Sequence, residues 1–267
     1  MGTNVQAGAG SGTREWDAGT YDRVSTPQQE WARPVVARLG LRGDETVLDA
    51  GCGSGRVTEV LLDALPRGEV IAVDGSAAMV AEARALLGEE RVSYIHSDLL
   101  DLDLDEAADA VFSNAVFHWI TDHERLFKRL RSALRPGGRI EAQCGGEGNV
   151  ARFYAAVAEV VGERAELASH IGDFQPHRFA SPDETERILT GLGFEDVSCT
   201  LEPRPVHPPE PREFIRSVCL VAHSELLPEE LRGELLDAVM DRLGPDPELD
   251  YVRLNISARK PVGGDGD

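Results

Sequence analysis

Lysine is nearly absent from this chain of 267 residues, which contains only Lys128 and Lys260. Asp and Glu number 47 against 27 Lys and Arg, so the formal net charge is −20 at pH 7. A field of that sign repels phosphate backbones and anionic membrane surfaces unless a local basic groove overcomes it. The composition therefore argues against nucleic-acid and membrane-surface partners.

Cysteine is also scarce, and the four cysteines lie far apart. Cys52, Cys144, Cys199 and Cys219 form no C-x-x-C pair, so the spacing supports neither a zinc site nor a disulfide framework, and no metal is expected. No run approaches the roughly 20 apolar residues of a membrane span. Residues 1–13 have neither the basic region nor the apolar run of a signal peptide. We therefore expect a protein of the reducing cytoplasm.

In the first half of the chain, short apolar runs alternate with amphipathic segments. The expected elements are strand 46–50, helix 56–65, strand 70–74, helix 77–87, strand 92–96, strand 110–114, helix 122–134, a turn at Pro136-Gly137-Gly138 and strand 139–144. Such alternation with short connections predicts a parallel sheet covered by helices on both faces.

Beyond Asn149 the pattern changes. We expect helices at 150–169, 182–191, 211–225 and 228–243, and strands at 194–201 and 251–258. This predicts one domain at 14–260 between disordered ends at 1–13 and 261–267. Its two helical insertions, about 149–180 and 203–247, follow strand five and separate the last two strands. Insertions at these places would form a lid over the carboxyl ends of the strands.

The most informative segment is Val47-Leu48-Asp49-Ala50-Gly51-Cys52-Gly53-Ser54-Gly55. Its three alternating glycines predict a tight turn from strand to helix that a ligand can approach closely. The dinucleotide fingerprint G-x-G-x-x-G would need glycine at position 56, where this chain has Arg56. Asp49 would also repel a pyrophosphate, whereas a cationic or zwitterionic ligand would tolerate it.

Two further carboxylates follow the next two strands. Asp74 closes the second strand, where an acid can accept hydrogen bonds from both hydroxyls of an adenosine ribose. Asp98 follows the third strand, where a carboxylate can accept from an adenine amino group. One strand-end Asp often only caps the next helix, but together with Asp49 the two indicate a nucleoside ligand.

These residues resemble the motifs of class I S-adenosylmethionine (SAM)-dependent methyltransferases. Residues 48–55 are similar to their glycine motif, Val73-Asp74 to their ribose-binding acid, Ser97-Asp98-Leu99 to their adenine loop and residues 134–138 to the turn before their fifth strand. The resemblance covers about residues 33–142. It implies an α/β, Rossmann-like fold with a seven-stranded, mostly parallel sheet of order 3-2-1-4-5-7-6, in which strand seven is antiparallel.

The resemblance implies SAM as the cofactor and S-adenosyl-L-homocysteine as the product. The cofactor contacts that it implies are Tyr21, Arg33, Asp49, Gly51, Cys52, Gly53, Asp74, Gly75, Met79, Ser97, Asp98, Leu99, Asn114 and Ala115. Tyr21 would fold over the cofactor and Arg33 would pair with its carboxylate, although the sequence fits a surface role for either residue equally well.

A narrower resemblance concerns the segment after strand four. Residues 113–119, then Asp122-His123, are similar to small-acid carboxyl methyltransferases such as the trans-aconitate, malonyl-carrier-protein and juvenile hormone acid enzymes. Arg33-Pro34 is similar to an Arg-Pro of the trans-aconitate group. The Asn-Pro-Pro-Tyr of amino-methylating DNA enzymes is absent at 114–117. The pattern favours a small-molecule acceptor more strongly than it favours a carboxylate oxygen.

His118 is the candidate catalytic residue, as a base or as a hydrogen-bond donor, and Trp119 is the candidate substrate contact. A carboxylate acceptor arrives ionised and needs no base, whereas a phenol, an amine or a carbon acid must lose a proton. A histidine that only hydrogen-bonds in the wall of the site and a tryptophan that only packs fit the sequence equally well. Further candidates from the insertions are His170, His177, Arg178 and His223.

Three classes of function fit the sequence. The leading one is a SAM-dependent methyltransferase that acts on a small molecule, with a carboxylate oxygen among the acceptors, or alternatively on nitrogen or carbon of a small metabolite. The second is another enzyme on the same fold, such as an aminopropyltransferase or a dehydrogenase, and the third is a non-catalytic SAM-binding protein. We expect a monomer or a homodimer.

Overall fold

The computed structural model describes residues 26–263, and its strands form one seven-stranded sheet. The strands are β1 (Thr46–Ala50), β2 (Glu69–Asp74), β3 (Val92–His96), β4 (Ala108–Asn114), β5 (Leu134–Gly145), β6 (Glu195–Pro203) and β7 (Val252–Arg259). Their order is β3-β2-β1-β4-β5-β7-β6. β1 to β5 pair in parallel, and β7 is antiparallel to β5 and β6. The predicted order and the antiparallel seventh strand are confirmed.

The helices gather in two places. Those packed on the sheet are α2 (Thr26–Arg38), α3 (Arg56–Ala64), α4 (Ala77–Leu87), α5 (His123–Ala133) and α8 (Pro182–Gly191). Those of the insertions are α6 (Ala151–Glu163), α7 (Ala165–Ile171), α9 (Pro211–Phe214), the π-helix η3 (Ile215–Cys219), α10 (Val221–Glu225) and α11 (Glu229–Leu243). Two 3-10 turns, η1 (Leu99–Asp101) and η2 (Phe117–Trp119), follow β3 and β4. Across residues 26–263, none of the helices is long and apolar enough to span a bilayer.

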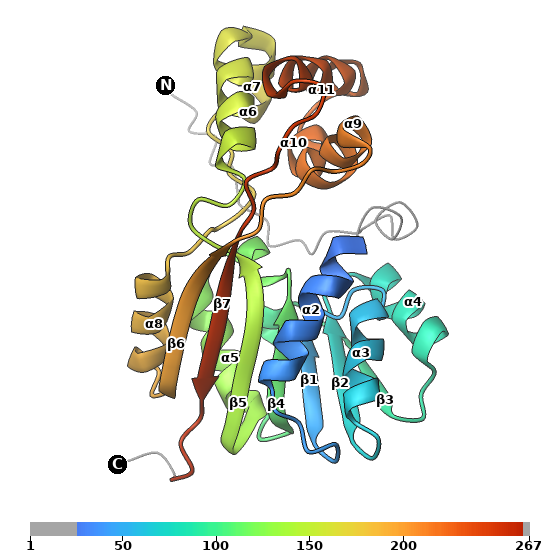
Figure 1. The fold of residues 1–267 in the computed structure, drawn as a ribbon, viewed down its shortest axis with the longest axis vertical. Helices are drawn as coiled ribbons and strands as arrows, with labels where there is room; N and C mark the ends of the chain where they lie inside the picture. Colours follow the sequence, from blue (N-terminus) through green and yellow to red (C-terminus); the bar gives the residue numbers. More distant parts are fainter. Residues whose placement is uncertain (1–25, 264–267) are drawn as a thin grey trace, which may run out of the picture.

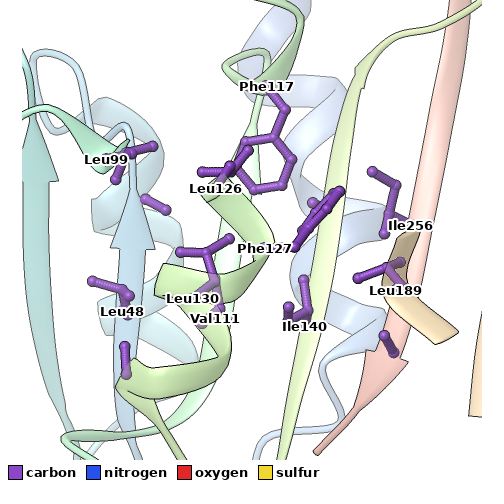
Figure 2. Close-up of a cluster of buried hydrophobic side chains, with 14 of the residues drawn as sticks. Leu48, Leu99, Val111, Phe117, Leu126, Phe127, Leu130, Ile140, Leu189 and Ile256 are labelled. Atoms are coloured by element: carbon purple, nitrogen blue, oxygen red, sulfur yellow. The ribbon is translucent and has the colours of Figure 1, made fainter. Parts of the chain in front are cut away.

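The sheet buries an apolar layer on each face. On one face, Phe127 and Leu130 of α5 pack against strand residues such as Val111 and Ile140 (Figure 2). On the other face, helices α2 to α4 cover a separate cluster that includes Val47. Strands covered on both faces carry near-continuous apolar runs, and this is why the strands were recognisable in the sequence.

The insertion helices have a third core of their own beyond the carboxyl ends of the parallel strands (Figure 1). α11 packs against α6, and its Leu235 and Val239 are fully buried. At the surface of this pair, Arg242 bonds to Glu159 at 2.6 Å. The insertions therefore form one helical layer at the position predicted for a lid. The limits of the predicted domain lie partly outside the described residues and stay predictions.

β5 begins earlier than predicted, directly after α5. Leu134 pairs with Ala108 and Arg139 pairs with Ala110, so residues 135–138 bulge between the two pairs. Gly137 has a φ of +79°, and a proline beside it has no N–H to give to a ladder. The turn expected at Pro136-Gly137-Gly138 is therefore a bulge inside the strand.

Two helices predicted as continuous are interrupted in the insertions. The first breaks at Arg164, whose backbone is extended with φ −127° and ψ 101°, and this separates α6 from α7. The second contains the π-helix η3 between α9 and α10. Both breaks border residues buried in the insertion core, Val161 and Ile215, so tertiary packing overrides the helical pattern there.

Candidate functional site

The glycine turn after β1 is built by two residues with different surroundings. Gly51 has a φ of +87°, and a Cβ added there would lie 2.3 Å from Cγ2 of Val116. Its N–H donates to the Val73 carbonyl at 2.8 Å. Gly53 also has a positive φ, +54°, but a Cβ there would meet no atom within 4 Å. The fold therefore requires glycine at position 51, whereas Gly53 faces space that a ligand can use.

Asp74, at the end of β2, is tied to this turn. Its Oδ2 accepts from the Gly53 N–H at 2.9 Å and its Oδ1 accepts from the Ser76 N–H at 2.9 Å. The side chain is half-buried. Each carboxylate oxygen has more than one acceptor position, so Asp74 is held in place and can still accept from the hydroxyls of a ligand.

Asp49 lies beneath the same turn, with 1% of its surface exposed. Burial raises the pKa of its carboxyl to about 7, although the hydrogen bond from the Thr58 hydroxyl lowers it. The charge of Asp74 raises it further. Two carboxylates near one glycine turn disfavour a phosphate and favour a cationic ligand.

Hydrogen bonds to backbone groups hold the loop after β3, which the sequence predicted to contact adenine. The Ser97 N–H donates to the Asp74 carbonyl at 3.0 Å. Asp98 caps η1, because its Oδ1 accepts from the Leu100 N–H at 2.8 Å. Leu99 is buried. Asp98 thus has the capping role that strand-end aspartates often have, while its Oδ2 makes no hydrogen bond within the described residues.

The other predicted cofactor residues fall into three groups. Gly75, Asn114 and Ala115 lie at the same edge and are half-buried, and Cys52 and Met79 are buried there. Burial raises the pKa of the Cys52 thiol, and the charges of Asp49 and Asp74 raise it further, so this cysteine is no reactive thiol. Arg33 is exposed on α2. Tyr21 lies outside the described residues.

His118 lies in η2, beyond the end of β4, and its ring has a defined partner. The backbone N–H of Gly145 donates to its Nδ1 at 3.3 Å. Burial lowers the pKa of His118 well below 6.5, and electrostatic interactions with His177, Arg253 and His123 lower it further. The imidazole is therefore neutral, and because Nδ1 accepts, the ring proton is on Nε2. His118 offers a hydrogen-bond donor, not a basic nitrogen, at Nε2.

The lid brings aromatic rings to His118 that sequence reasoning missed. Phe179 stacks on His118 with the ring centroids 6.0 Å apart. The hydroxyl of Tyr154, from α6, bonds to Nδ1 of His177, whose ring centroid lies 3.9 Å from that of Trp119. Neither Tyr154 nor Phe179 belongs to a motif, so no local signal marked them.

The four candidate residues from the insertions differ in how close they lie to His118. His177 joins the cluster around His118, at 5.2 Å between ring centroids, and the Arg178 N–H donates to the His118 carbonyl at 2.8 Å. His223 is buried in α10 among aromatic rings of the lid. His170 is exposed on α7. Only the first two come near the candidate catalytic residue.

Arg253, on β7, is a second residue that the sequence did not reveal. Its backbone pairs with Gly145, the residue that holds His118. Its side chain is 3% exposed, donates from Nε to Gln143 at 3.4 Å and lies over the Trp31 ring at 5.1 Å. A buried guanidinium thus contributes positive charge beside His118.

The site has two halves with opposite electrostatics. The turn after β1 carries two carboxylates, whereas the region of His118 carries neutral imidazole and a guanidinium. Within residues 26–263, no three His, Cys, Asp or Glu side chains are grouped as metal ligands would be. Chemically, the arrangement can hold a cationic ligand beside an anionic one and align them for reaction.

Comparisons with known proteins agree with this geometry. A family profile described as a methyltransferase domain matches residues 48–142. The trans-aconitate 2-methyltransferase of Acidovorax ebreus is 34% identical over 129 residues, which cover 48% of this chain and 49% of that protein. The chain thus spans about half the length of the first curated relatives that it matches.

A longer match and a solved structure extend the likeness. An uncharacterized methyltransferase of Schizosaccharomyces pombe is 31% identical over 185 residues, covering 67% of this chain and 70% of that protein. The structure of phosphoethanolamine N-methyltransferase 2 from Haemonchus contortus, bound to phosphomonomethylethanolamine and S-adenosylhomocysteine, superposes with a TM-score of 0.60. The superposition covers 91% of this chain and 57% of the Haemonchus contortus chain at 20% sequence identity, so it shows that the two proteins share a fold. The profile, the long match and the sheet order together show that the chain belongs to the class I SAM-dependent methyltransferase family.

Proposed function

We propose that this protein transfers the methyl group of SAM to a carboxylate oxygen of a small acid. The proposal depends on one observation, the hydrogen bond from the Gly145 N–H to Nδ1 of His118. Because that bond leaves the proton on Nε2, the histidine nearest the end of β4 is a donor. A donor suits an ionised acceptor and does not suit a hydroxyl or an amine that must lose a proton.

SAM fits the half of the site around Gly53. The sulfonium and the ammonium of SAM are cationic, which matches the two carboxylates Asp49 and Asp74. The space beside Gly53 and the acceptor positions of Asp74 support a nucleoside there. When bound, SAM supplies a methyl group on a positively charged sulfur, which is a strong electrophile.

The chain's own residues would orient the acceptor and exclude water. His118 would donate from Nε2 to one oxygen of the acceptor's carboxylate, and Arg253 would supply positive charge beside it. The other oxygen forms the O–CH₃ bond as the S–CH₃ bond breaks. The carboxylate charge and the sulfonium charge cancel, so the products are a methyl ester and S-adenosyl-L-homocysteine, and no proton is transferred.

The names of the relatives agree with this proposal, since those in the first group are trans-aconitate 2-methyltransferases. The acidic surface of the chain supports a small-molecule acceptor in preference to a nucleic acid. The cytoplasmic location and the monomeric or homodimeric state stay predictions from the sequence.

A panel of matched acceptors tests the function. Carboxylic acids are compared with the alcohols and the amines of the same skeletons, and release of S-adenosylhomocysteine and the mass of the product are measured. We expect release with acids and a product that mild alkali returns to the acid. Turnover of alcohols or amines without acids would overturn the carboxylate proposal, and SAM binding without any turnover would favour a non-catalytic SAM-binding protein.

A further inference from the structure

Five rings meet between the sheet and the lid, and we call them the ring cluster: His118, Trp119, Tyr154, His177 and Phe179. His118 and Trp119 come from η2, Tyr154 from α6, and the other two from the segment before α8. All five side chains are half-buried. Rings that served only as core would be buried like Phe117 and Phe127, so the ring cluster keeps surface that a ligand can contact.

Three rings of the cluster, those of His118, His177 and Phe179, are stacked, whereas the Tyr154 ring meets His177 and Phe179 edge-on. The rings of His177 and Phe179 are 5.3 Å apart at an interplanar angle of 11°, and Phe179 stacks on His118 at 30°. Phe179 lies close over Gly145, since a Cβ on that glycine would be 2.7 Å from its ring. Stacked aromatic faces bind planar groups better than puckered ones of equal size.

The charges near the ring cluster suit one anionic group. Two imidazoles, those of His177 and His123, and the Arg253 guanidinium lower the pKa of His118, and no carboxylate of the described residues is among the groups that shift it. Arg178, the other guanidinium nearby, bonds to Glu184 at 2.6 Å and to the Thr121 carbonyl. An acceptor with several carboxylates would lose the hydration of its additional negative charges without gaining positively charged partners in this region.

The hydrogen bond between Tyr154 and His177 defines a second donor. His177 is the one hydrogen-bond partner of the Tyr154 hydroxyl among the described residues. Burial raises the pKa of Tyr154, so the phenol keeps its proton and donates a hydrogen bond to Nδ1. His177, like His118, then carries its own proton on Nε2.

We propose that the ring cluster is the acceptor site, and that its ligand is a monocarboxylic acid with a planar, apolar skeleton, aromatic or conjugated. The proposal depends on the carboxylate methylation proposed above. The carboxylate lies at His118, and the skeleton lies against Phe179 and His177. Tyr154 is a positioning residue that holds His177.

Matched acids test the shape and the charge of the acceptor. Rates with SAM are measured for benzoate, cinnamate and naphthoate, for cyclohexanecarboxylate, which has a puckered ring, and for trans-aconitate and tricarballylate, which have three carboxyls. We expect kcat/KM for the best planar monoacid to exceed that for cyclohexanecarboxylate roughly threefold to tenfold and that for the triacids by more than about tenfold.

The outcomes separate this inference from the proposed function. Equal or higher kcat/KM for a triacid or for cyclohexanecarboxylate would overturn the planar monoacid and leave carboxylate methylation standing. Turnover of alcohols or amines alone would overturn both.

Two pairs of variants test the ring cluster itself. Phe179→Leu keeps apolar volume but removes the flat face, and we expect the kcat/KM ratio of the planar acid to cyclohexanecarboxylate to fall toward one. Phe174→Leu, in the same segment but outside the ring cluster, should leave that ratio unchanged. An equal loss for both acids in Phe179→Leu would indicate packing alone and overturn the assignment.

Tyr154→Phe removes one hydroxyl and should raise KM for the planar acid roughly fivefold, the loss of one hydrogen bond, with kcat within about twofold. The control is Tyr94→Phe, whose hydroxyl bonds to the Gly88 carbonyl under α4 and whose change should affect neither constant. An unchanged KM in Tyr154→Phe would contradict the role assigned to Tyr154.

Discussion

The backbone N–H of Gly53 donates to Oδ2 of Asp74 over 2.9 Å, which joins the glycine turn after β1 to the carboxylate at the end of β2. The carboxylate that is proposed to bind the ribose of SAM is therefore also a part of the turn that accommodates the cofactor. Substitution of either residue should affect the other.

Asp74→Ala should weaken SAM binding by tenfold or more, because each hydrogen bond to a charged group contributes roughly 1.5–3 kcal/mol. Asp74→Asn is the matched variant. The Asn side chain keeps one carbonyl oxygen that can accept from one backbone N–H, but its NH₂ group then faces the second N–H donor. The affinity of this variant for SAM should therefore lie between those of the wild type and Asp74→Ala. Titration calorimetry measures all three, and equal dissociation constants would place the ribose elsewhere.

Gly51→Ala and Gly53→Ala should have different effects, although both glycines have a positive φ. The added Cβ at position 51 would overlap Val116, so this variant should lose several kcal/mol of stability. At position 53 the Cβ meets nothing, and the cost is the backbone strain of about 1–2 kcal/mol. Thermal unfolding should show a much lower Tm for Gly51→Ala, and SAM affinity should fall in Gly53→Ala while the protein stays folded.

Asp49 should make the free protein less stable as pH rises. Its pKa is 3.8 in an unfolded chain and about 7 in the folded protein. Between these values the folded state holds a proton that the unfolded state has lost, so the free energy of unfolding falls with increasing pH, by about 4 kcal/mol in all. Denaturant unfolding at pH 4 and pH 8 measures the change.

Asp49→Asn is the control for that pH dependence, because Asn can accept from the Thr58 hydroxyl and does not titrate. The variant should lose this decrease and be the more stable protein at pH 8. Glu45 titrates alike in both proteins: burial raises its pKa, but hydrogen bonds from the backbone of residues 42–45 outweigh burial and lower it to about 2. The stability that it contributes begins to be lost as pH falls through 4.5, and this loss cancels in the comparison of wild type with Asp49→Asn. Parallel curves for wild type and Asp49→Asn would refute the prediction.

His118→Gln should keep turnover within about tenfold of the wild type. The Gln amide can accept from the Gly145 N–H and donate to the acceptor, as the imidazole does. His118→Leu can do neither and should lose considerably more. A hundredfold loss in His118→Gln, with SAM affinity preserved, would show that the ring acts as a base.

The pH profile of the wild-type rate is an independent measurement on the same residue. The pKa of His118 is lowered well below 6.5 and a carboxylate acceptor is already ionised. At saturating SAM, where ionisation of Asp49 no longer limits cofactor binding, the rate should therefore be flat from about pH 6 to pH 9. A rise in rate near pH 6.5 would contradict the donor role and favour an acceptor that must lose a proton.

Much of the arrangement of the proposed cofactor half could be predicted because its signals are local. Asp49, Gly51 and Gly53 lie within one short strand-and-turn segment, and Asp74 and Asp98 follow the next two strands. Parallel strands bring their carboxyl ends to one edge of a sheet, so the sequence positions alone placed these residues together. The bulge at residues 135–138 and the break at Arg164 were missed, because they depend on strand pairing and on packing inside the lid.

By itself, the sequence determined the strands, the glycine turn and the carboxylates at the strand ends, since apolar periodicity and glycine content act over a few residues. The order of the strands in the sheet was implied by the resemblance to the methyltransferases. The tertiary structure decided the acceptor half. Gly145 lies 27 residues from His118, and Arg253 comes from the last strand of the chain. From its residue type alone, His118 would titrate near 6.5 and could act as a base. Burial, nearby positive charge and one backbone N–H make it a neutral donor, because pKa and tautomer depend on surroundings that only folding brings together.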